Sequence, residues 1–181
     1  FAVPPSYPMT QEFDASSVSF RLMTPSDRDL LLAFAQSLPE SDLIYLRMDI
    51  TQPEIVDEWI ENLEAGRAVT IFAEEDGHII GYGTLHTNRL MWTRHIGEIR
   101  ILVDARARGG GVGRSMATQL TDIAREQKLY RVVVQLPADQ PRVRNMFEEL
   151  GFEPQAILPD WLKDRHNKPH DLVIMSKNVV D

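Results

Sequence analysis

The chain contains no cysteine among its 181 residues. Disulfide bonds, thiolate metal ligands and a cysteine nucleophile are therefore excluded. A reaction that passes through a covalent intermediate on a cysteine thiol is likewise excluded.

Long apolar runs are also lacking, since no segment approaches the ~20 residues that a membrane-spanning helix needs. The first residues contain several prolines and lack the basic start and apolar core of a secretory signal. We expect an extended, proline-containing N-terminal arm over residues 1–17 and a single domain over residues 18–181. These features predict a cytoplasmic protein with no membrane partner.

The chain has fewer basic than acidic residues: 19 Lys and Arg compared with 27 Asp and Glu, which gives a formal net charge of −8. Nucleic-acid binding needs a basic footprint, so no nucleic-acid partner is expected. An acidic surface mildly favours cationic substrates such as amines.

What the chain does have is a glycine-rich segment, Arg108-Gly-Gly-Gly-Val-Gly113, between a β-branched apolar run and an amphipathic helix. Glycines carry no Cβ atom, so a ligand can approach their backbone closely. The helix expected to start at about Gly111 leaves N–H groups in its first turn without intrahelical partners. With the helix dipole and the flanking arginines, these donors predict a site for a phosphate or a pyrophosphate.

Two common nucleotide motifs do not fit this segment. The pattern G-x-x-x-x-G-K-[ST] requires glycine at 108 and lysine at 114, and arginine occupies both positions. The pattern G-x-G-x-x-G fails because Arg114 or Met116 stands where its last glycine belongs. The pattern [QR]-x-x-G-x-[GA] does fit, as Arg108-x-x-Gly111-x-Gly113. A glycine-rich turn that binds no ligand is the alternative.

Hydrophobic periodicity and turn residues predict the elements of the remaining chain. Helices are expected over about 25–38, 51–66 and 111–124, with a further one that ends at 151. Strands are expected over about 18–23, 68–73, 79–86, 93–103, 130–136 and 172–176, with a hairpin turn at Asp76-Gly77. The order β-α-α-β-β-β-α-β-α-β indicates an α/β fold with a mixed sheet covered by helices.

This order and two motifs resemble the GCN-related N-acetyltransferases, the GNAT superfamily. The segment 108–113 resembles the family's acyl-CoA pyrophosphate loop, and Ile101-Leu102-Val103-Asp104 resembles the strand that pairs with pantetheine. The segment 139–152 is similar to the family's pattern N-x-x-A-x-x-L-Y-x-x-x-G-F. Over residues 18 to 177, the resemblance implies a GNAT-like acyl-CoA N-acyltransferase fold whose central sheet splays between segments 96–103 and 130–136.

The resemblance also implies acetyl-CoA as the co-substrate, with no metal. The residues expected to bind acetyl-CoA are Ile101, Leu102, Val103, Arg108, Gly109, Gly110, Gly111, Val112, Gly113, Arg114 and Gln140. Glu98 is the candidate catalytic base, because a protonated amine must lose a proton before it can attack. An ordinary solvated strand residue is the alternative, since alternation groups Glu98 with Arg100 and Leu102 without telling which face they occupy.

The chain departs from the family pattern at the residue that acts as the general acid, the group that protonates the departing CoA thiolate. The usual tyrosine falls at Phe147, which carries no proton to donate, and the usual asparagine falls at Gln140. Tyr82, Tyr130 or water are the candidates to protonate the departing thiolate.

Other residues are candidates for the acceptor pocket. They are Tyr45, Arg47 and Asp49 between the first two helices, and Trp92, Arg94 and His95 beside the sheet. The segment Asp160–Asp171 is dense in His and Asp and is expected to form a solvated loop or a lid. A metal site there is disfavoured because Pro169 separates His166 from His170.

The sequence therefore predicts an acetyl-CoA-dependent N-acetyltransferase that acts on a primary amine of a small molecule, a peptide or a protein. The main alternative is a non-catalytic acyl-CoA sensor or regulatory module. A nucleotide phosphate binder without acyl chemistry is a further alternative, and it is disfavoured because neither common nucleotide motif is present. A homodimer is possible in principle through an exposed terminal strand.

Overall fold

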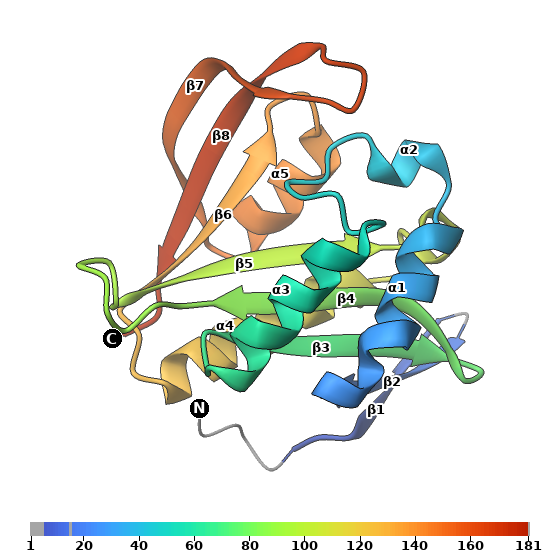
Figure 1. Cartoon of the computed structure of the whole chain (residues 1–181). Coiled ribbons are helices and arrows are strands. Elements are labelled where there is room, and N and C mark those ends of the chain that lie inside the picture. Colours follow the sequence, from blue (N-terminus) through green and yellow to red (C-terminus); the bar gives the residue numbers. More distant parts are fainter. Residues whose placement is uncertain (1–5, 15, 181) are drawn as a thin grey trace.

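A computed structural model describes residues 6–14 and 16–180, and one eight-stranded sheet runs through this part of the chain (Figure 1). The strands lie in the order β1-β2-β3-β4-β5-β6-β8-β7. Their bounds are β1 Met9–Phe13, β2 Ser16–Leu22, β3 Ala68–Glu75, β4 His78–His86, β5 Ile96–Val103, β6 Arg131–Pro137, β7 Glu153–Lys163 and β8 Pro169–Asn178.

The bounds of the helices are η1 Pro25–Asp27, α1 Arg28–Ser37, α2 Glu40–Leu43, α3 Pro53–Glu64, η2 Ala105–Ala107, α4 Val112–Glu126 and α5 Pro141–Glu149, where η marks a 3₁₀ turn. The four predicted helices are present in the predicted order, as α1, α3, α4 and α5, and the short segments α2 and η2 were not predicted. The predicted α/β class and mixed sheet are confirmed, and β1 and β7 are two strands that the sequence patterns did not indicate. No helix in the described ranges is long and apolar enough to cross a membrane.

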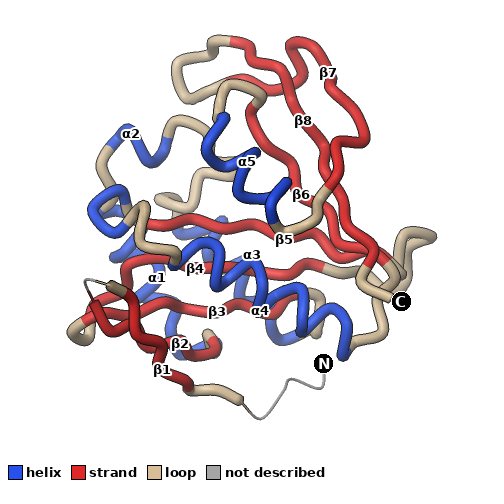
Figure 2. Tube along the Cα trace, turned by 180° about the vertical axis from the view of Figure 1, so that it is seen from behind, coloured by secondary structure: helices blue, strands red, loops and turns tan. Residues whose placement is uncertain are grey.

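Helices cover the sheet on both faces. The first core contains Leu31 of α1, Val56 of α3 and Leu102 of β5, so α1 and α3 pack on the face turned toward the viewer in Figure 1. The second core contains Ile99 of β5 together with Leu120 of α4, on the face seen in Figure 2. Because Ile99 and Leu102 belong to different layers, the strand alternates between them as a β-strand should.

Two glycines of β4 lie where neighbouring elements approach closely, Gly83 against α4 and Gly81 against β5. A Cβ atom on Gly83 would lie 3.0 Å from Leu120 Cδ1, and one on Gly81 would lie 2.7 Å from the carbonyl oxygen of Leu102. The Gly83 distance is tighter than most side-chain contacts, so α4 lies close to the sheet there. The Gly81 distance is too short for any side chain, and it reflects the close approach of β5. At the start of α4, a Cβ atom on Gly113 would lie 3.6 Å from Val103 Cγ2, so the helix begins next to the end of β5.

The sheet opens between β5 and β6, the parallel pair. Their ladder consists of Ile96–Arg131, Gly97–Val132 and Glu98–Val133, after which the strands separate although both continue. In Figure 1 the upper leaf of β6, β8 and β7 turns away from β5. The splayed sheet implied by the resemblance is therefore present.

The last strand is not at an edge of the sheet, contrary to the premise of the predicted dimer. β8 pairs with β6 on one side and β7 on the other, so β1 and β7 form the two edges. The segment predicted as a loop, 160–171, instead forms the end of the β7–β8 hairpin, with a turn between Lys163 and Pro169. A homodimer stays a prediction, and β7 is the edge near the C-terminus that could support it.

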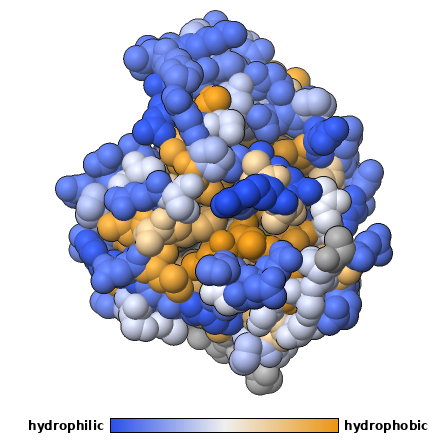
Figure 3. Space-filling view, turned by 90° about the vertical axis from the view of Figure 1, so that its right-hand side faces the viewer, coloured by the Kyte–Doolittle hydropathy of each residue, from blue (hydrophilic) through white to orange (hydrophobic). Residues whose placement is uncertain are grey.

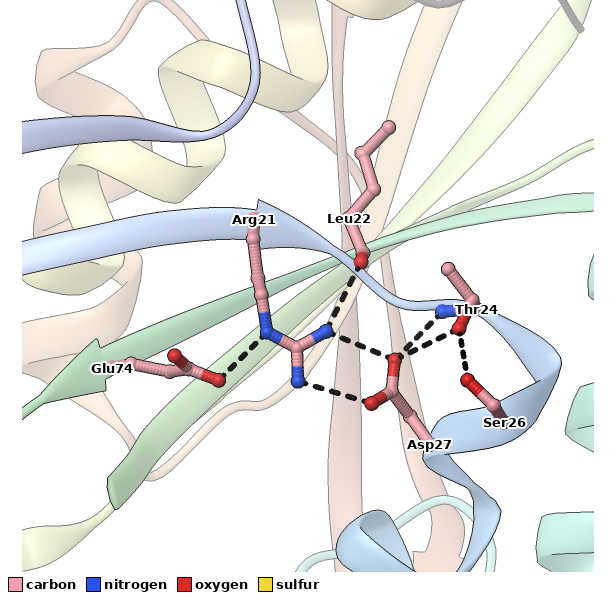
Figure 4. Close-up of polar contacts among 6 residues, drawn as sticks. All are labelled: Arg21, Leu22, Thr24, Ser26, Asp27 and Glu74. Atoms are coloured by element: carbon pink, nitrogen blue, oxygen red, sulfur yellow. Dashed lines mark hydrogen bonds and ion pairs between the residues drawn. The ribbon is translucent and has the colours of Figure 1, made fainter. Parts of the chain in front are cut away.

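Arg21 joins β2 to β3 and to the start of the helical layer (Figure 4). Its Nε donates to Glu74 Oε1 at 2.8 Å, and Nη1 and Nη2 donate to the two carboxylate oxygens of Asp27 at 2.9 and 3.0 Å. Asp27 Oδ2 also accepts the backbone N–H of Thr24 at 2.8 Å, as one half of a capping box at this turn.

Replacing Asp27 by alanine removes the cap and both bonds from Arg21, and it leaves that guanidinium paired with Glu74 alone. We expect Asp27→Ala to lower the free energy of unfolding by about 1–2 kcal/mol, measured by urea denaturation. Asp29→Ala is the matched control, because that side chain is 92% exposed, and it should change stability by less than about 0.5 kcal/mol. Equal effects of the two variants would contradict the role given to Asp27.

Candidate functional site

A cavity of about 820 Å³ opens where β5 and β6 separate, and residues of both helical layers line it. Figure 3, which faces the side of the molecule where β5 ends, shows apolar surface gathered in a hollow across the middle of this face. The cavity has two parts. One lies along the end of β5, the glycine loop and α5, and we call it the cofactor cleft. The other lies on the α3 side of the sheet, and we call it the acceptor chamber.

The glycine loop forms one end of the cofactor cleft. Gly109 and Gly111 have φ of +85° and +93°, values that L side chains rarely adopt, and Gly111 is the N-cap of α4. A Cβ atom on Gly109 would meet nothing within 4 Å. Gly111, Val112 and Gly113 line the cavity, so the N–H groups of the first turn of α4 and the positive end of its dipole lie at a space that suits an anion.

Arg108 anchors this loop to α2. Its Nη2 donates to Asp42 Oδ1 at 2.6 Å, and its Nε donates to the carbonyl oxygen of Val103 at 3.0 Å. The Asp42 side chain is fully buried and also accepts the backbone N–H of Ala105 at 3.2 Å. Because its charge is paired in this way, Arg108 sets the shape of the loop, while Arg114 pairs with Glu149 at the first turn of α4.

The structure brings the predicted cofactor residues together. Those that line the cavity are Ile101, Leu102, Val103, Arg108, Gly109, Gly111, Val112, Gly113, Arg114 and Gln140. Gly110 does not line the cavity. It connects Gly109 and Gly111, which both do. After Glu98, the edge of β5 that faces β6 is no longer paired with β6. The backbone N–H and C=O groups along this edge can therefore pair with an extended ligand.

Two strands form the floor of the acceptor chamber. Tyr82 and Leu102 are paired across β4 and β5, and both belong to the core under α1 and α3. Alternation then places His86 and its partner Glu98 on the same face, which decides the orientation that the sequence left open. The walls come from α3, through Glu58 and Trp59, and from the loop after α2, through Arg47 and Met48.

Glu98 lies between two arginines. Its Oε1 accepts from Arg47 Nη1 and, at 3.2 Å, from Arg100 Nε. The Glu98 side chain is 21% exposed, so the carboxylate is half-buried and still reachable from the cavity. The sequence suggested Arg47 as a pocket residue, but it did not suggest its contact with Glu98. Arg100 was missed, and its signal was its position two residues after Glu98 on the same strand face.

His86, another residue that the sequence reading missed, lies in the chamber as a neutral imidazole. Burial lowers its pKa from 6.5 to about 3, and the positive charges of Arg100 and Arg47 lower it further in the same direction. At neutral pH it can therefore donate or accept a hydrogen bond without carrying charge. Its position opposite Glu98 suits it to hold a water molecule or a polar group of a substrate.

The depressed pKa of His86 predicts an acid-sensitive fold. Between pH 6.5 and 3 the unfolded chain binds a proton that the folded chain excludes, so stability falls as pH decreases below 6.5, approaching about 1.4 kcal/mol per pH unit. We expect His86→Gln to reduce the loss of stability between pH 7 and pH 5, measured by urea denaturation. His78→Gln, at an exposed hairpin position, should leave that loss unchanged. A pH dependence identical in wild type and His86→Gln would contradict this assignment.

The position of the missing tyrosine is a wall of the cavity. Phe147 is 3% exposed and packs edge-on against Phe152, with ring centroids 5.0 Å apart. Of the two replacement tyrosines suggested by the sequence, Tyr82 lines the cavity, whereas Tyr130 lies at the other end of β6 beside His95. Tyr130 is thus not among the residues of the site.

Hydrogen bonds and ion pairs connect the β7–β8 hairpin to the loop that follows α2 and to Asp139. Tyr45, which lines the cavity, donates from its hydroxyl to Asp139 Oδ2 at 2.8 Å, and His170 lies between Asp139 and Asp164, at 3.2 and 2.7 Å. Partial burial and the hydrogen bond to Asp139 raise the pKa of Tyr45 to about 12, so its hydroxyl stays protonated. The backbone N–H of Arg165 also donates to the carbonyl oxygen of Ile44 at 3.1 Å. The hairpin therefore packs against the loop after α2 instead of forming a free solvated loop, and none of its described residues lines the cavity.

Several acceptor candidates lie elsewhere. Asp49 accepts hydrogen bonds from Thr51 at the approach to α3 and is not a lining residue. Trp92, Arg94 and His95 belong to the exposed β4–β5 connection and do not line the cavity either. Across residues 6–14 and 16–180, no three His, Asp or Glu side chains gather as metal ligands would.

A mixed sheet that splays at a parallel strand pair, with a glycine-rich helix start at the opening, defines an acyl-CoA-dependent N-acyltransferase fold. The chain belongs to the acetyltransferase (GNAT) family, whose model matches residues 33–152. Acetyl-CoA-dependent N-acetyl transfer is the chemistry of this class, and acetyl-CoA is its co-substrate.

Solved structures resemble the whole fold. A ribosomal-protein-alanine N-acetyltransferase from Brucella melitensis is 26% identical, with a TM-score of 0.75 over 88% of this chain and 98% of that one. A putative acetyltransferase from Salmonella typhimurium, solved with acetyl-CoA, is 19% identical, with a TM-score of 0.76 over 91% of this chain and 95% of that one.

A curated relative matches a shorter stretch. The mycothiol acetyltransferase of Beutenbergia cavernae is 36% identical over 62 residues, which make up 34% of this chain. The match spans 21% of the length of that relative, so the likeness concerns one part of a longer protein.

Proposed function

We propose that the protein transfers the acetyl group of acetyl-CoA directly to a primary amine of a small molecule, a peptide or a protein. The observation that carries this proposal is the single cavity that joins the glycine loop to Glu98 through the opening between β5 and β6. Such a cavity can hold the thioester and the amine at the same time, and holding both in line supplies much of the rate. The absence of cysteine agrees with direct transfer.

In this proposal acetyl-CoA occupies the cofactor cleft. The N–H groups of residues 108 to 113 hold the pyrophosphate, and the backbone of Ile101 to Val103 pairs with the amides of pantetheine, as an exposed strand edge pairs with an added strand. Gln140, at the N-cap of α5, approaches the same stretch from the opposite side of the opening. The acetyl group then points toward the acceptor chamber.

The amine enters the chamber and loses a proton to Glu98, directly or through a water molecule beside His86. Its nitrogen attacks the thioester carbonyl carbon, and the C–S bond breaks as the tetrahedral intermediate collapses. The nitrogen gives its second proton to water as the amide forms, and the thiolate of CoA leaves. Because a thiol has a pKa near 8.5, the thiolate is a fair leaving group and can take its proton from water. Tyr82 is the one suggested tyrosine that lines the cavity, and Phe147 contributes only apolar contact.

The test is release of the CoA thiol from acetyl-CoA in the presence of a panel of amines, with detection of the acetylated product by mass spectrometry. The proposal expects amine-dependent thiol release. The competing function, a non-catalytic acyl-CoA sensor, expects acetyl-CoA to bind without any thiol release. That alternative agrees with Phe147, but it gives no use to the half-buried carboxylate of Glu98. The cytoplasmic site of action rests on where acyl-CoA is found and stays a prediction.

A further inference from the structure

The charges of the acceptor chamber do not balance around Glu98. One carboxylate accepts from two guanidinium groups, Arg47 and Arg100, so this cluster carries a net charge of +1. The chain as a whole carries −8, which makes a cationic site inside its cavity a local exception. A surplus positive charge in a partly buried cavity is stabilised when an anion binds there.

The two arginines differ in how firmly they are held. Arg100 is on β5, 28% exposed, and its Nη1 also lies 3.9 Å from the sulfur of Met48. Arg47 is on the irregular loop after α2, and its side chain is 46% exposed. In the described part of the structure, each of the two arginines donates one N–H to Glu98. A guanidinium group carries five N–H donors, so each arginine has donors left for a second carboxylate. Arg47 is the one that can move toward a ligand.

The other charged wall of the chamber does not cancel this surplus. Glu58 comes from α3 and is exposed to solvent, where its charge is screened. The phosphates of acetyl-CoA do not account for the arginines either. Glu98 and Val103 are five residues apart on one strand, which is about 17 Å at the rise of a β-strand, and the glycine loop follows Val103.

We propose that the acceptor is an amine that also carries a carboxylate, of the α-amino acid type, and that Arg47 and Arg100 bind this carboxylate. The inference rests on the proposed function and names the substrate class of the same site. The carboxylate of the acceptor binds Arg47, which then no longer contacts Glu98. The ammonium group of the acceptor comes to lie beside the Glu98 carboxylate. Binding of the correct acceptor thereby uncovers the base. A polyamine would instead place a second ammonium group against the arginines.

The apolar lining gives the acceptor its second feature. Met48, Ile50, Ile55 and Trp59 line the chamber beside the arginines, so an apolar side chain fits. Leucine is therefore a suitable probe.

The experiment compares leucine, leucinamide and 3-methylbutylamine as acceptors, by thiol release at saturating acetyl-CoA. The amine of leucinamide is less basic than that of leucine and the amine of 3-methylbutylamine is more basic, so basicity alone cannot favour the acid over both. We expect kcat/KM for leucine to exceed both others by at least tenfold. Arg47→Gln should raise the KM for leucine at least tenfold and lower kcat/KM for leucine far more than kcat/KM for 3-methylbutylamine, so that the preference for leucine is lost.

Arg125→Gln is the matched control, because this arginine pairs with Asp122 on the far turn of α4, and it should keep the preference for leucine. Calorimetric titration of leucine into the CoA complex gives a readout that does not need catalysis, and Arg47→Gln should weaken it. If the uncharged acceptors react as well as leucine, or if Arg47→Gln leaves the preference intact, the inference is wrong while the proposed function stands. If acetyl-CoA binds and no amine of any kind is acetylated, the proposed function fails and the inference fails with it.

Discussion

Gly113→Leu is expected to weaken acetyl-CoA binding by about 100-fold or more, which corresponds to ~2.7 kcal/mol of binding free energy. A Cβ atom at this position would lie 3.6 Å from Val103 Cγ2 and 4.0 Å from Met146 Sδ, in ordinary contact, so the backbone of α4 is not strained. The rest of a leucine side chain would extend among Ile101, Val103 and Met146, where the cofactor cleft lies. The measurement is calorimetric titration of acetyl-CoA into each protein.

The variant tests the effect of filling the cleft with a side chain. It does not remove a backbone N–H donor for the pyrophosphate, because leucine has the same backbone N–H as glycine. It should also fold at least as well as the wild type, because leucine favours a helix over glycine by up to about 1 kcal/mol. Thr118→Leu, one turn further along the exposed side of α4, is the matched control and should bind acetyl-CoA normally. Tight binding by Gly113→Leu would place the cofactor elsewhere.

Glu98→Gln is expected to lower kcat by about 100-fold while the KM for acetyl-CoA stays unchanged. Glutamine still accepts hydrogen bonds from Arg47 and Arg100, so the chamber keeps its shape, but it cannot take the proton of the amine. The loss should shrink as pH rises toward the pKa of the acceptor amine, because the amine then arrives already deprotonated. The measurement is the pH profile of kcat for a reactive amine.

Two carboxylates provide the comparison for Glu98. Glu61→Gln, on the exposed side of α3, should behave as the wild type. Glu58→Gln, on the chamber wall, should change kcat far less than Glu98→Gln does. If Glu58→Gln causes the larger loss, the base comes from α3 and the role given to β5 is wrong.

Local chemistry predicted most of the fold. Asp76 and Gly77 adopt φ of 52° and 79°, as the hairpin signal requires, and Gly111 begins α4 where the glycine pattern placed the helix. The strands that the patterns missed are the two edges. β7 is exposed at most of its positions, so it carries no alternation of apolar and polar residues that a sequence could reveal. Pairing with β8, a tertiary event, makes it a strand.

The candidate site was predictable where it follows the backbone and not where it depends on tertiary contact. The glycine loop and the end of β5 are continuous in sequence, so their residues could be named in advance. The contact between Arg47 and Glu98 joins residues 51 positions apart, and the contact between Tyr45 and Asp139 joins residues 94 positions apart. Neither contact has a local pattern. The neutral state of His86 likewise depends on burial and on Arg100, which only the folded sheet supplies.

The measurement that tests the central claim most directly is two-substrate initial-rate kinetics, with acetyl-CoA and a reactive amine varied against each other. A cavity that holds the thioester and the amine together predicts intersecting double-reciprocal lines and no acetylated enzyme when the amine is left out. Parallel lines, with an acetyl group retained on the protein, would contradict direct transfer and would show that the two halves of the cavity are used in turn.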